Sequence, residues 1–476
     1  MDDETVERRT FIAFVVAAAG GVVALVYGLL DQASSNGGVS PQTTPESGTE
    51  TTATQTPSSA VDVERFGLEA DGETDDTQAI VRALRKVPVG GTLRLPPGDI
   101  VIAAKGDSDA AITLPPKYGV TIEGAGTGSS GTRLLMASNH ANNHTGLAIK
   151  SSDGDSSSSQ IIQASGDREQ GEVVIRDLVL DGNWSEQKPD DGDWMNGFGI
   201  DIRGGEQPVT IENCVVQNWV TNGGLMGASG IRVRNCTFRN NGWGVHEEGR
   251  RGHGFNVNTS DSSGRVVAEN CYFKDNVGQA VDNNGGKVTV RNCIFDGHEF
   301  GIKMDADTED VLLENVHIIG NERTEIPIKC IPTGNESTGS LRLRSVIIEN
   351  ARWPAIDLPQ RPGPVSGDNI LIRNVDQDNH RGAGFYIRSG RNVDIGTLSV
   401  HDISGSALNF EGARGNIKEL VYSGVSGVGE TADVSIGAAR EGDPISVSVP
   451  SKSEVGAGRS SSSRSGGSSG SSGGNG

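Results

Sequence analysis

The sequence predicts an all-β chain that folds as a right-handed parallel β-helix, a single-stranded solenoid with a short N-terminal capping helix. A unit of alternating apolar residues followed by Asn recurs along the middle of the chain, and recurrence is the signature of a solenoid. The alternation has a period of two, which is typical of strands. Aromatic residues make up only 4% of the chain and Gly contributes 67 residues, which favours short strands with tight corners over a two-layer fold.

Residues 1–32 predict a twin-arginine-like export signal or a transmembrane anchor. Arg8 and Arg9 precede an uncharged stretch at 11–30, which is long enough to cross a bilayer core of about 30 Å as a helix. We expect a protein exported to the cell surface and held in the membrane by this helix, or secreted if the signal is cleaved. Residues 33–60 are rich in Thr, Ser and Pro and predict a disordered stalk.

The predicted β-helix covers residues 61–450, and a Ser/Gly-rich tail that we expect to be disordered follows at 451–476. The repeating Asn is expected to take the left-handed conformation at a corner and to bond to the Asn one coil above. It occurs at Asn213, Asn235, Asn270, Asn292, Asn315, Asn350 and Asn374, after Asp177 in an earlier unit. Most steps suit one coil, and the two longest indicate loop insertions or a marker that has drifted.

Four of the five cysteines follow this Asn and are expected to point into the core as free thiols: Cys214, Cys236, Cys271 and Cys293. No pair has C-x-x-C spacing, which argues against a zinc or redox motif.

Charge limits the classes of partner. The chain has 62 acidic and 41 basic residues and a net charge of −21, which argues against nucleic acid. Such a balance, with few Lys residues, favours a salt-adapted, haloarchaeal source over an ordinary acidic secreted protein. It also makes a polyanionic ligand harder to hold except in high salt, where repulsion is screened.

An N-terminal cap is predicted at residues 66–102, which begin FGLEADGETDDTQAI. Asp75 or Asp76 is expected to cap a helix that runs to about Lys86 and closes the end of the solenoid with one apolar face. That face comprises Ile80, Ala83, Leu84 and Val87. The passage resembles the N-terminal cap of the pectate-lyase superfamily of β-helix proteins.

Two further passages resemble the alginate C5-epimerase branch of this superfamily: DLVLDGNWSEQKPDDGDWMNGF at 177–198 and RGHGFNVNTSD at 251–261. In the coil between them, TNGGLMGAS (221–229) stands where that branch carries its catalytic Tyr, Asp and His, and His246 and Glu247 follow one coil later. The Gly-His-Gly turn around His253 and the Ile-Lys pair ending at Lys303 are also similar to polygalacturonase hydrolases.

Stacking the strand that follows the second turn of each coil predicts one polar outer face. The candidate catalytic residues on or beside it are His253, His246, Arg251, Lys303 and Asp282. The candidate substrate-binding residues are Glu247, Asn256, Asp305, Asp201, Arg388 and Tyr386.

Chemistry at C5 of a uronic acid needs a cation for the carboxylate, a base and an acid. Arg251 or Lys303 suits the carboxylate, and His253 or His246 suits proton transfer. Asp282 and Asp305 are candidates for a second acid or for Ca²⁺ ligands.

Three functions stay open. The first is an extracellular carbohydrate-active protein that acts on an acidic polysaccharide, as a uronan lyase or C5-epimerase if it is an enzyme. The second is a non-catalytic cell-surface protein that binds glycan or builds the envelope, and the third is a polygalacturonase-like glycoside hydrolase. A monomer or a trimer is expected.

Overall fold

The computed structural model describes residues 60–458, apart from gaps at 105–109, 115–118, 140–144, 151–170, 188–196, 204–207, 243–251, 260–263, 306, 332–338, 359–362, 376–381 and 389–391. The predicted anchor and nearly all of the predicted stalk lie outside these residues. Within them, no helix is long and apolar enough to cross a membrane.

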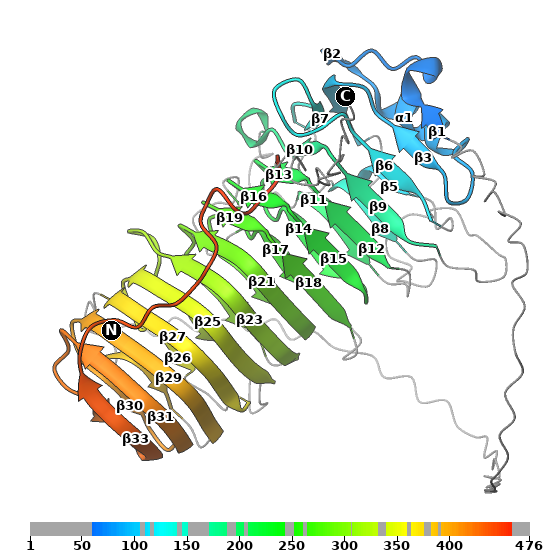
Figure 1. Ribbon diagram of the computed structural model, residues 1–476. Coiled ribbons are helices and arrows are strands. Elements are labelled where there is room, and N and C mark those ends of the chain that lie inside the picture. Colours follow the sequence, from blue (N-terminus) through cyan, green and yellow to red (C-terminus); the bar gives the residue numbers. More distant parts are fainter. Residues whose placement is uncertain are drawn as a thin grey trace, which may run out of the picture. The chain divides into compact units, whose positions relative to one another are not determined.

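Two parallel sheets build the fold, and each new coil adds strands to both of them (Figure 1). We call the 21-stranded sheet "sheet A" and the 12-stranded sheet "sheet B". Neighbouring strands of sheet B pair in parallel and in register; for example, Asn256 lies opposite Asp282, which lies opposite Lys303. The predicted all-β parallel β-helix with a short N-terminal helix is confirmed.

The strands of sheet B are β5 (Ala110–Leu114), β8 (Thr145–Lys150), β11 (Phe198–Arg203), β14 (Gly224–Gly227), β17 (Phe255–Val257), β20 (Gln279–Asn283), β22 (Phe300–Met304), β24 (Ile328–Cys330), β26 (Ile356–Leu358), β28 (Ala383–Ile387), β30 (Ser406–Phe410) and β32 (Gly429–Glu430).

The strands of sheet A are β1 (Ala60–Asp62), β2 (Asp71–Asp75), β3 (Thr92–Arg94), β4 (Gly98–Ile102), β6 (Thr121–Glu123), β7 (Thr132–Met136), β9 (Val173–Arg176), β10 (Val179–Asp181), β12 (Val209–Glu212), β13 (Val215–Gln217), β15 (Ile231–Arg234), β16 (Thr237–Arg239), β18 (Arg265–Glu269), β19 (Tyr272–Lys274), β21 (Gly286–Asp296), β23 (Thr308–Ile319), β25 (Ser340–Ala351), β27 (Val365–Val375), β29 (Asn392–Ile403), β31 (Arg414–Ser423) and β33 (Asp433–Glu441).

The corners are made by residues with positive φ, as the repeat predicts. Asn213, Asn235, Asn270, Asn292 and Asn315 have φ between 50° and 54°. Asn315 Nδ2 donates to Asn292 Oδ1 at 3.1 Å, and Asn270 Nδ2 donates to Asn235 Oδ1 at 3.3 Å. The side-chain amides therefore link successive coils, and the predicted Asn ladder is confirmed.

The two long steps in the repeat have different causes. In the step from Asn235 to Asn270, β16 and β17 are farther apart in the sequence than β13 and β14 of the preceding coil, so this step contains inserted residues. The step from Asn315 to Asn350 is a change of corner, because the register places Ser345, with φ 52°, opposite Asn315. Asn350 belongs to the second corner of its coil, so the marker has drifted.

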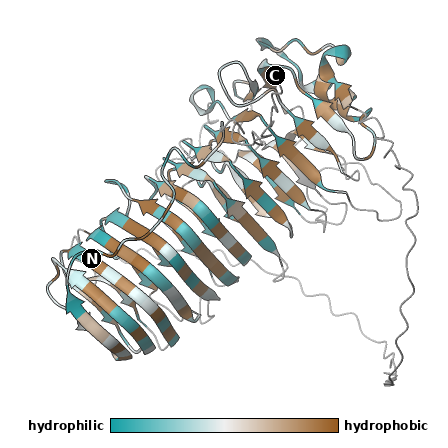
Figure 2. Ribbon diagram, viewed as in Figure 1, coloured by the Kyte–Doolittle hydropathy of each residue, from teal (hydrophilic) through white to brown (hydrophobic). Residues whose placement is uncertain are grey.

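Both sheets contribute buried apolar side chains to one core inside the solenoid. Bands of apolar residues run across the strands in Figure 2. All five cysteines are buried, and the four predicted core thiols, Cys214, Cys236, Cys271 and Cys293, form no disulfide bond, as predicted. Phe238 and Phe273 stack with ring centroids 5.3 Å apart. Equivalent residues of successive coils thus stack on one another and fill the core in layers.

The N-terminal end is closed by α1 (Thr77–Leu84), preceded by the 3₁₀ turn η1 (Val63–Phe66); a second 3₁₀ turn, η2 (Trp184–Glu186), lies farther along. The predicted face of α1 is buried. Asp76 is the N-cap residue, and its carboxylate accepts hydrogen bonds from the backbone of Glu69 and Ala70.

After β33 the chain turns back along sheet A (Figure 1). Gly442 N donates to Tyr422 O at 3.1 Å, and Ala457 N donates to Thr237 Oγ1 at 3.1 Å. Residues 451–458 of the predicted tail belong to this returning segment, and residues 459–476 lie outside the described residues.

Candidate functional site

A row of polar side chains crosses the outer face of sheet B. Asn256 of β17, Asp282 of β20 and Lys303 of β22 occupy equivalent positions on neighbouring strands. Val281 and Ile302, the preceding residues on β20 and β22, are fully buried in the core, so alternation directs the polar row outward. Neighbouring strands lie roughly 4.8 Å apart, which brings these side chains into contact.

Asp282 lies at the centre of the row and is only 4% exposed. Lys303 Nζ binds its Oδ1 at 3.0 Å. Asn256 Nδ2 and Asn284 Nδ2 donate to its Oδ2 at 2.9 and 3.2 Å, and His253 Nε2 lies 3.3 Å from the same oxygen. Four donors converge on one carboxylate, so Asp282 fixes the positions of the side chains around it.

His253 enters this cluster from the turn before β17. Its backbone N–H donates to Asn222 Oδ1 at 3.0 Å, and Gln279 N–H donates to His253 Nδ1 at 3.2 Å. Because a backbone amide can only donate, Nδ1 carries the lone pair, and the proton of the neutral ring is on Nε2, facing Asp282. Burial lowers the pKa of His253 to about 4 although the Asp282 carboxylate opposes this.

Lys303 lies between two carboxylates. Its Nζ is 3.0 Å from Asp282 Oδ1 and 3.0 Å from Asp305 Oδ2. Burial disfavours the ammonium ion, but the two carboxylates outweigh burial and raise the pKa of Lys303. Burial also raises the pKa of Asp305, against the opposing effect of Lys303. The Asp305 side chain is 23% exposed and that of Asp282 is 6% exposed, so Asp305 is the carboxylate that a ligand can reach.

Three predicted residues lie in or beside the same face but farther along it. Asp201 is two strands from Asn256 in the row, and its Oδ1 binds Arg203 Nε at 2.9 Å. Tyr386 is three strands beyond Lys303. Arg388 Nε lies 3.7 Å from Glu411 Oε2. At least one strand separates these side chains from the Asp282 cluster.

His246, Glu247 and Arg251 lie outside the described residues, in the segment 243–251 that ends just before Gly252. Their roles stay predictions.

The structure adds residues that the sequence analysis did not assign to the site. Asn284 follows Asp282 by two positions, so alternation alone places it on the same side. The backbone amide of Gln279 and the side chain of Asn222 hold His253, and no sequence pattern signals either contact. Asn256 Oδ1 and Gln279 Oε1 are buried without a hydrogen-bond partner among the described residues.

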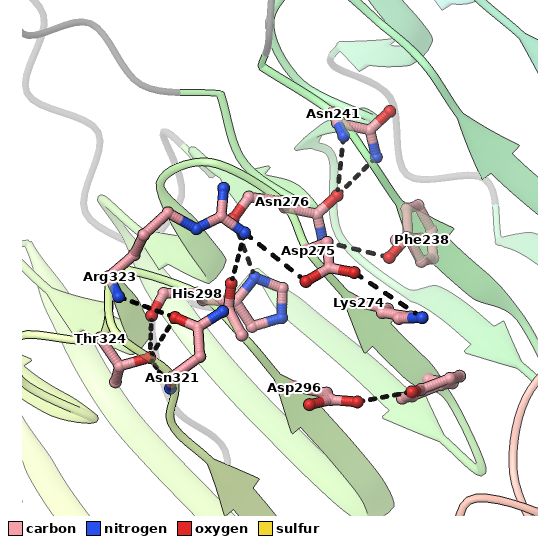
Figure 3. A network of polar contacts seen from close by, with 12 residues as sticks. Phe238, Asn241, Lys274, Asp275, Asn276, Asp296, His298, Asn321, Arg323 and Thr324 are labelled. Atoms are coloured by element: carbon pink, nitrogen blue, oxygen red, sulfur yellow. Dashed lines mark hydrogen bonds and ion pairs between the residues drawn. The ribbon is translucent and has the colours of Figure 1, made fainter. Parts of the chain in front are cut away.

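A buried polar ladder supports the turns that lead from sheet A into sheet B (Figure 3). Asn241 Nδ2 donates to Asn276 Oδ1 at 2.8 Å, His298 Nδ1 donates to Asn276 O at 3.2 Å, and Thr324 Oγ1 donates to His298 O at 2.6 Å. Burial lowers the pKa of His298 to about 4. The ladder fixes the turns that precede β20, β22 and β24, and thereby the spacing of the polar row.

No group of three or more His, Cys, Asp or Glu side chains is arranged to hold a metal ion in the part of the chain that the structure describes. Asp282 and Asp305, the residues predicted as a second acid or as Ca²⁺ ligands, both bind Lys303.

Comparison with known proteins supports the fold. A family model described as "Right handed beta helix region" matches residues 116–304 and 225–395. The solved A-module of mannuronan C-5 epimerase AlgE6 from Azotobacter vinelandii superposes with a TM-score of 0.50 and 16% identity, covering 81% of this chain and 100% of that module.

Two curated relatives match in sequence. Mannuronan C5-epimerase AlgE6 from Azotobacter vinelandii is 33% identical over 158 residues, which are 33% of this chain and 16% of that protein. Mannuronan C5-epimerase AlgE3 from the same organism is 28% identical over 277 residues, which are 54% of this chain and 14% of that protein. The chain therefore matches less than a fifth of the length of these relatives.

Proposed function

Because the chain belongs to the right handed beta helix region family and is distantly related to mannuronan C5-epimerase A-modules, we propose that it is an extracellular carbohydrate-active protein. Its ligand in this proposal is an acidic polysaccharide, and its chemistry is of the uronan lyase or C5-epimerase type. The cluster of Asp282, Lys303, Asp305, His253 and Asn256 is the proposed site, and this cluster is the observation that carries the proposal.

The cluster supports uronate chemistry through three features. Lys303 is a partly buried cation held by Asp282 on its buried side and by the more exposed Asp305 on the other, so the carboxylate of a sugar would compete with Asp305 for it. Asp305 has a raised pKa and is the more accessible acid, which suits a group that exchanges a proton. Asn256 Nδ2 donates to Asp282 Oδ2 at 2.9 Å, which helps to fix Asp282 and, through it, Lys303 before a ligand binds.

In this proposal His253 orients Asp282. Its Nδ1 lone pair is engaged by a backbone amide and its Nε2 faces a carboxylate, so neither nitrogen points to a sugar. Asp282 in turn fixes Lys303. The proton removed from C5 would pass to Asp305 or to a residue of 243–251, where His246 lies.

Electrostatics sets the conditions for binding. Lys303 is shared by two carboxylates, and Arg203 and Arg388 are each paired with an acidic residue. A polyanion therefore meets few uncompensated cations on the described face, and the net charge of −21 repels it. Salt at molar concentration shortens the range of this repulsion, the screening length, to roughly 3 Å. Binding is therefore expected to need high salt.

The non-catalytic alternative rests on the same cluster. Four donors already occupy the Asp282 carboxylate, so this carboxylate can hold the surrounding side chains in place for binding without taking part in a reaction. The hydrolase alternative is weaker. Asp282 and Asp305 bind one nitrogen at 3.0 Å each, so the facing oxygens are closer than the roughly 6.5–9.5 Å that separates the carboxyls of inverting hydrolases.

The experiment incubates the full chain with polymannuronate, polyguluronate and polygalacturonate in molar salt. Unsaturated ends are followed by ultraviolet absorbance, C5 exchange by deuterium uptake, reducing ends by titration and binding by calorimetry. Unsaturated ends or C5 exchange supports the proposal. Binding without any product supports the non-catalytic alternative, and new reducing ends without unsaturation support the hydrolase.

Two variants make the test specific to the site. Lys303→Ala removes the cation of the cluster. Lys287→Ala removes an exposed cation of sheet A that pairs with Glu309 at 3.2 Å, and it serves as the matched control. The proposal requires loss of binding in the first variant only.

A further inference from the structure

The outer face of sheet A carries a row of residues that are mostly apolar and buried, although they point away from the core. We call this row the outer stripe; it comprises Ile294, His317, Ile347, Leu371, Ser399 and Val421, which pair in register across six strands. Ile347, for example, lies between Val346 and Ile348, which are both fully buried in the core. Alternation therefore directs Ile347 outward, yet it is only 8% exposed.

Residues 442–458, which we call the strap, cover this row. Ile445 N donates to Ser399 Oγ at 3.2 Å near one end of the outer stripe, and Lys452 Nζ binds Asp296 Oδ2 at 2.5 Å near the other. Figure 1 shows the strap running along sheet A between these points. Val421, Leu371 and Ile294 are at most 4% exposed under it.

The sequence of the strap suits this position. In the stretch ISVSV, Ile445, Val447 and Val449 are partly buried, whereas Ser446 and Ser448 are exposed. This period of two is that of an extended chain with one apolar face. Pro444 and Pro450 flank the stretch and lack an N–H group, and the stretch forms no strand. Side chains rather than a backbone ladder therefore attach it to the sheet.

The far end of the strap is fixed by specific polar contacts. Asp296 Oδ2 accepts a hydrogen bond from Tyr272 Oη at 2.6 Å as well as from Lys452. Gly456 N donates to Asn270 O at 2.9 Å. A Cβ atom on Gly456 would lie 2.6 Å from Thr237 Oγ1, so this position admits only glycine without rearrangement.

The strap is joined to the coils at Gly442 and is longer than the distance that it spans. From β31 to β16 the chain passes seven strand spacings, or roughly 34 Å. The 15 Cα–Cα steps from residue 442 to residue 457 can reach roughly 50 Å when extended. The strap can therefore leave and return without a change in the coils.

We propose that the outer stripe is a peptide-docking surface whose occupant is the chain's own strap, bound as a separable segment. A stripe without its strap exposes Ile294, Ile347, Leu371 and Val421 in one line. Contiguous apolar surface of this kind drives association, so the strap also keeps two copies of the chain apart.

The first test uses the full chain and two matched pairs of substitutions. Val447→Asp with Val449→Asp places charges against the outer stripe, whereas Ser446→Asp with Ser448→Asp places the same charges in solvent. Trypsin cleavage after Lys452 is measured by mass spectrometry. The valine pair is expected to raise the cleavage rate at least tenfold and the serine pair to leave it unchanged. Equal rates in the two variants would overturn the proposal.

The second test removes the strap. A chain that ends at Glu441 is compared with a chain that ends at Gly458, which keeps the strap. The shorter chain is expected to self-associate in light scattering and to bind a labelled peptide of residues 442–458 at one per chain, with a return to monomer. A shorter chain that stays monomeric and does not bind the peptide contradicts the proposal.

Discussion

Two buried histidines predict a loss of stability in mild acid. His253 and His298 have pKa values of about 4 in the folded chain, against 6.5 for an unperturbed ring. Between these pH values the unfolded chain binds more protons than the folded chain, so the free energy of unfolding falls as the pH falls from 6.5 to 4. Below pH 4 both states are protonated and the loss is complete.

The size of this loss follows from the pKa difference. A pKa difference of about 2.5 corresponds to roughly 3 kcal/mol of the free energy of unfolding for each ring. Between pH 6.5 and 4, each ring lowers this free energy by about 1.4 kcal/mol for every decrease of one pH unit. The carboxylate of Glu349 titrates lower. Its hydrogen bond from His317 lowers the pKa to about 2, so its contribution is lost only between pH 4.5 and 2. Most of the histidine window, from pH 6.5 to 4.5, therefore lies above the range in which Glu349 titrates.

The perturbation is His298→Gln, which keeps a donor for the carbonyl of Asn276 but binds no proton. The free energy of unfolding is measured by urea titration between pH 7 and 4 in molar salt, with amide exchange in β20 and β22 as the local measure, because coils of a solenoid can open separately. The variant is expected to lose about half of the pH dependence of these strands. Unchanged pH dependence, or a His253 ring that titrates near 6.5 by NMR in the folded chain, would refute the reasoning.

Three further predictions concern the Asp282 cluster, the Asn ladder at the corners and the binding of a polyanion. Asp282→Asn leaves one acceptor oxygen for four donors and is expected to destabilise the chain by about 2–3 kcal/mol in urea titration, with a lower pKa of Lys303 by NMR; a neutral effect would show that the cluster is not a charge-dependent unit. Asn292→Ala removes the acceptor for Asn315 and places Ala at φ 51°, so a loss of about 1–2 kcal/mol is expected in the same titration, and no loss would contradict the role of the ladder. Affinity for polymannuronate is expected to rise between 0.1 and roughly 2 M salt in calorimetry, because screening reduces repulsion; an affinity that falls would show that unpaired cations dominate binding.

Local patterns made the fold predictable. Asn at the corners, alternation in the strands and the apolar face of the N-terminal helix all depend on residues a few positions apart, so the sequence carries them directly. The row Asn256–Asp282–Lys303 was also predictable. When coils have a nearly constant length, residues about one repeat apart in the sequence lie opposite each other on neighbouring strands.

Other features depend on contacts that no local pattern encodes. The donation from Gln279 N–H to His253 Nδ1 involves the backbone, and it engages the lone pair of the ring that was predicted to transfer a proton. Lys303 was predicted to bind the carboxylate of a uronate. Its position between Asp282 and Asp305 depends on side-chain rotamers, which the sequence pattern does not give. The strap lies against residues up to 220 positions earlier in the chain. Residues 442–450 were predicted as part of the β-helix and residues 451–458 as part of a disordered Ser/Gly-rich tail, because no local pattern encodes such distant contacts.

Deuterium uptake at C5 of polymannuronate tests the proposed function most directly. The full chain, Lys303→Ala, Asp305→Asn and Lys287→Ala are incubated with the polymer in D₂O at molar salt, and exchange is read by proton NMR. The site on sheet B predicts exchange with the unaltered chain and with Lys287→Ala, and loss of it in the other two variants. No exchange and no unsaturated product with any of the three polyuronates would contradict the proposed chemistry.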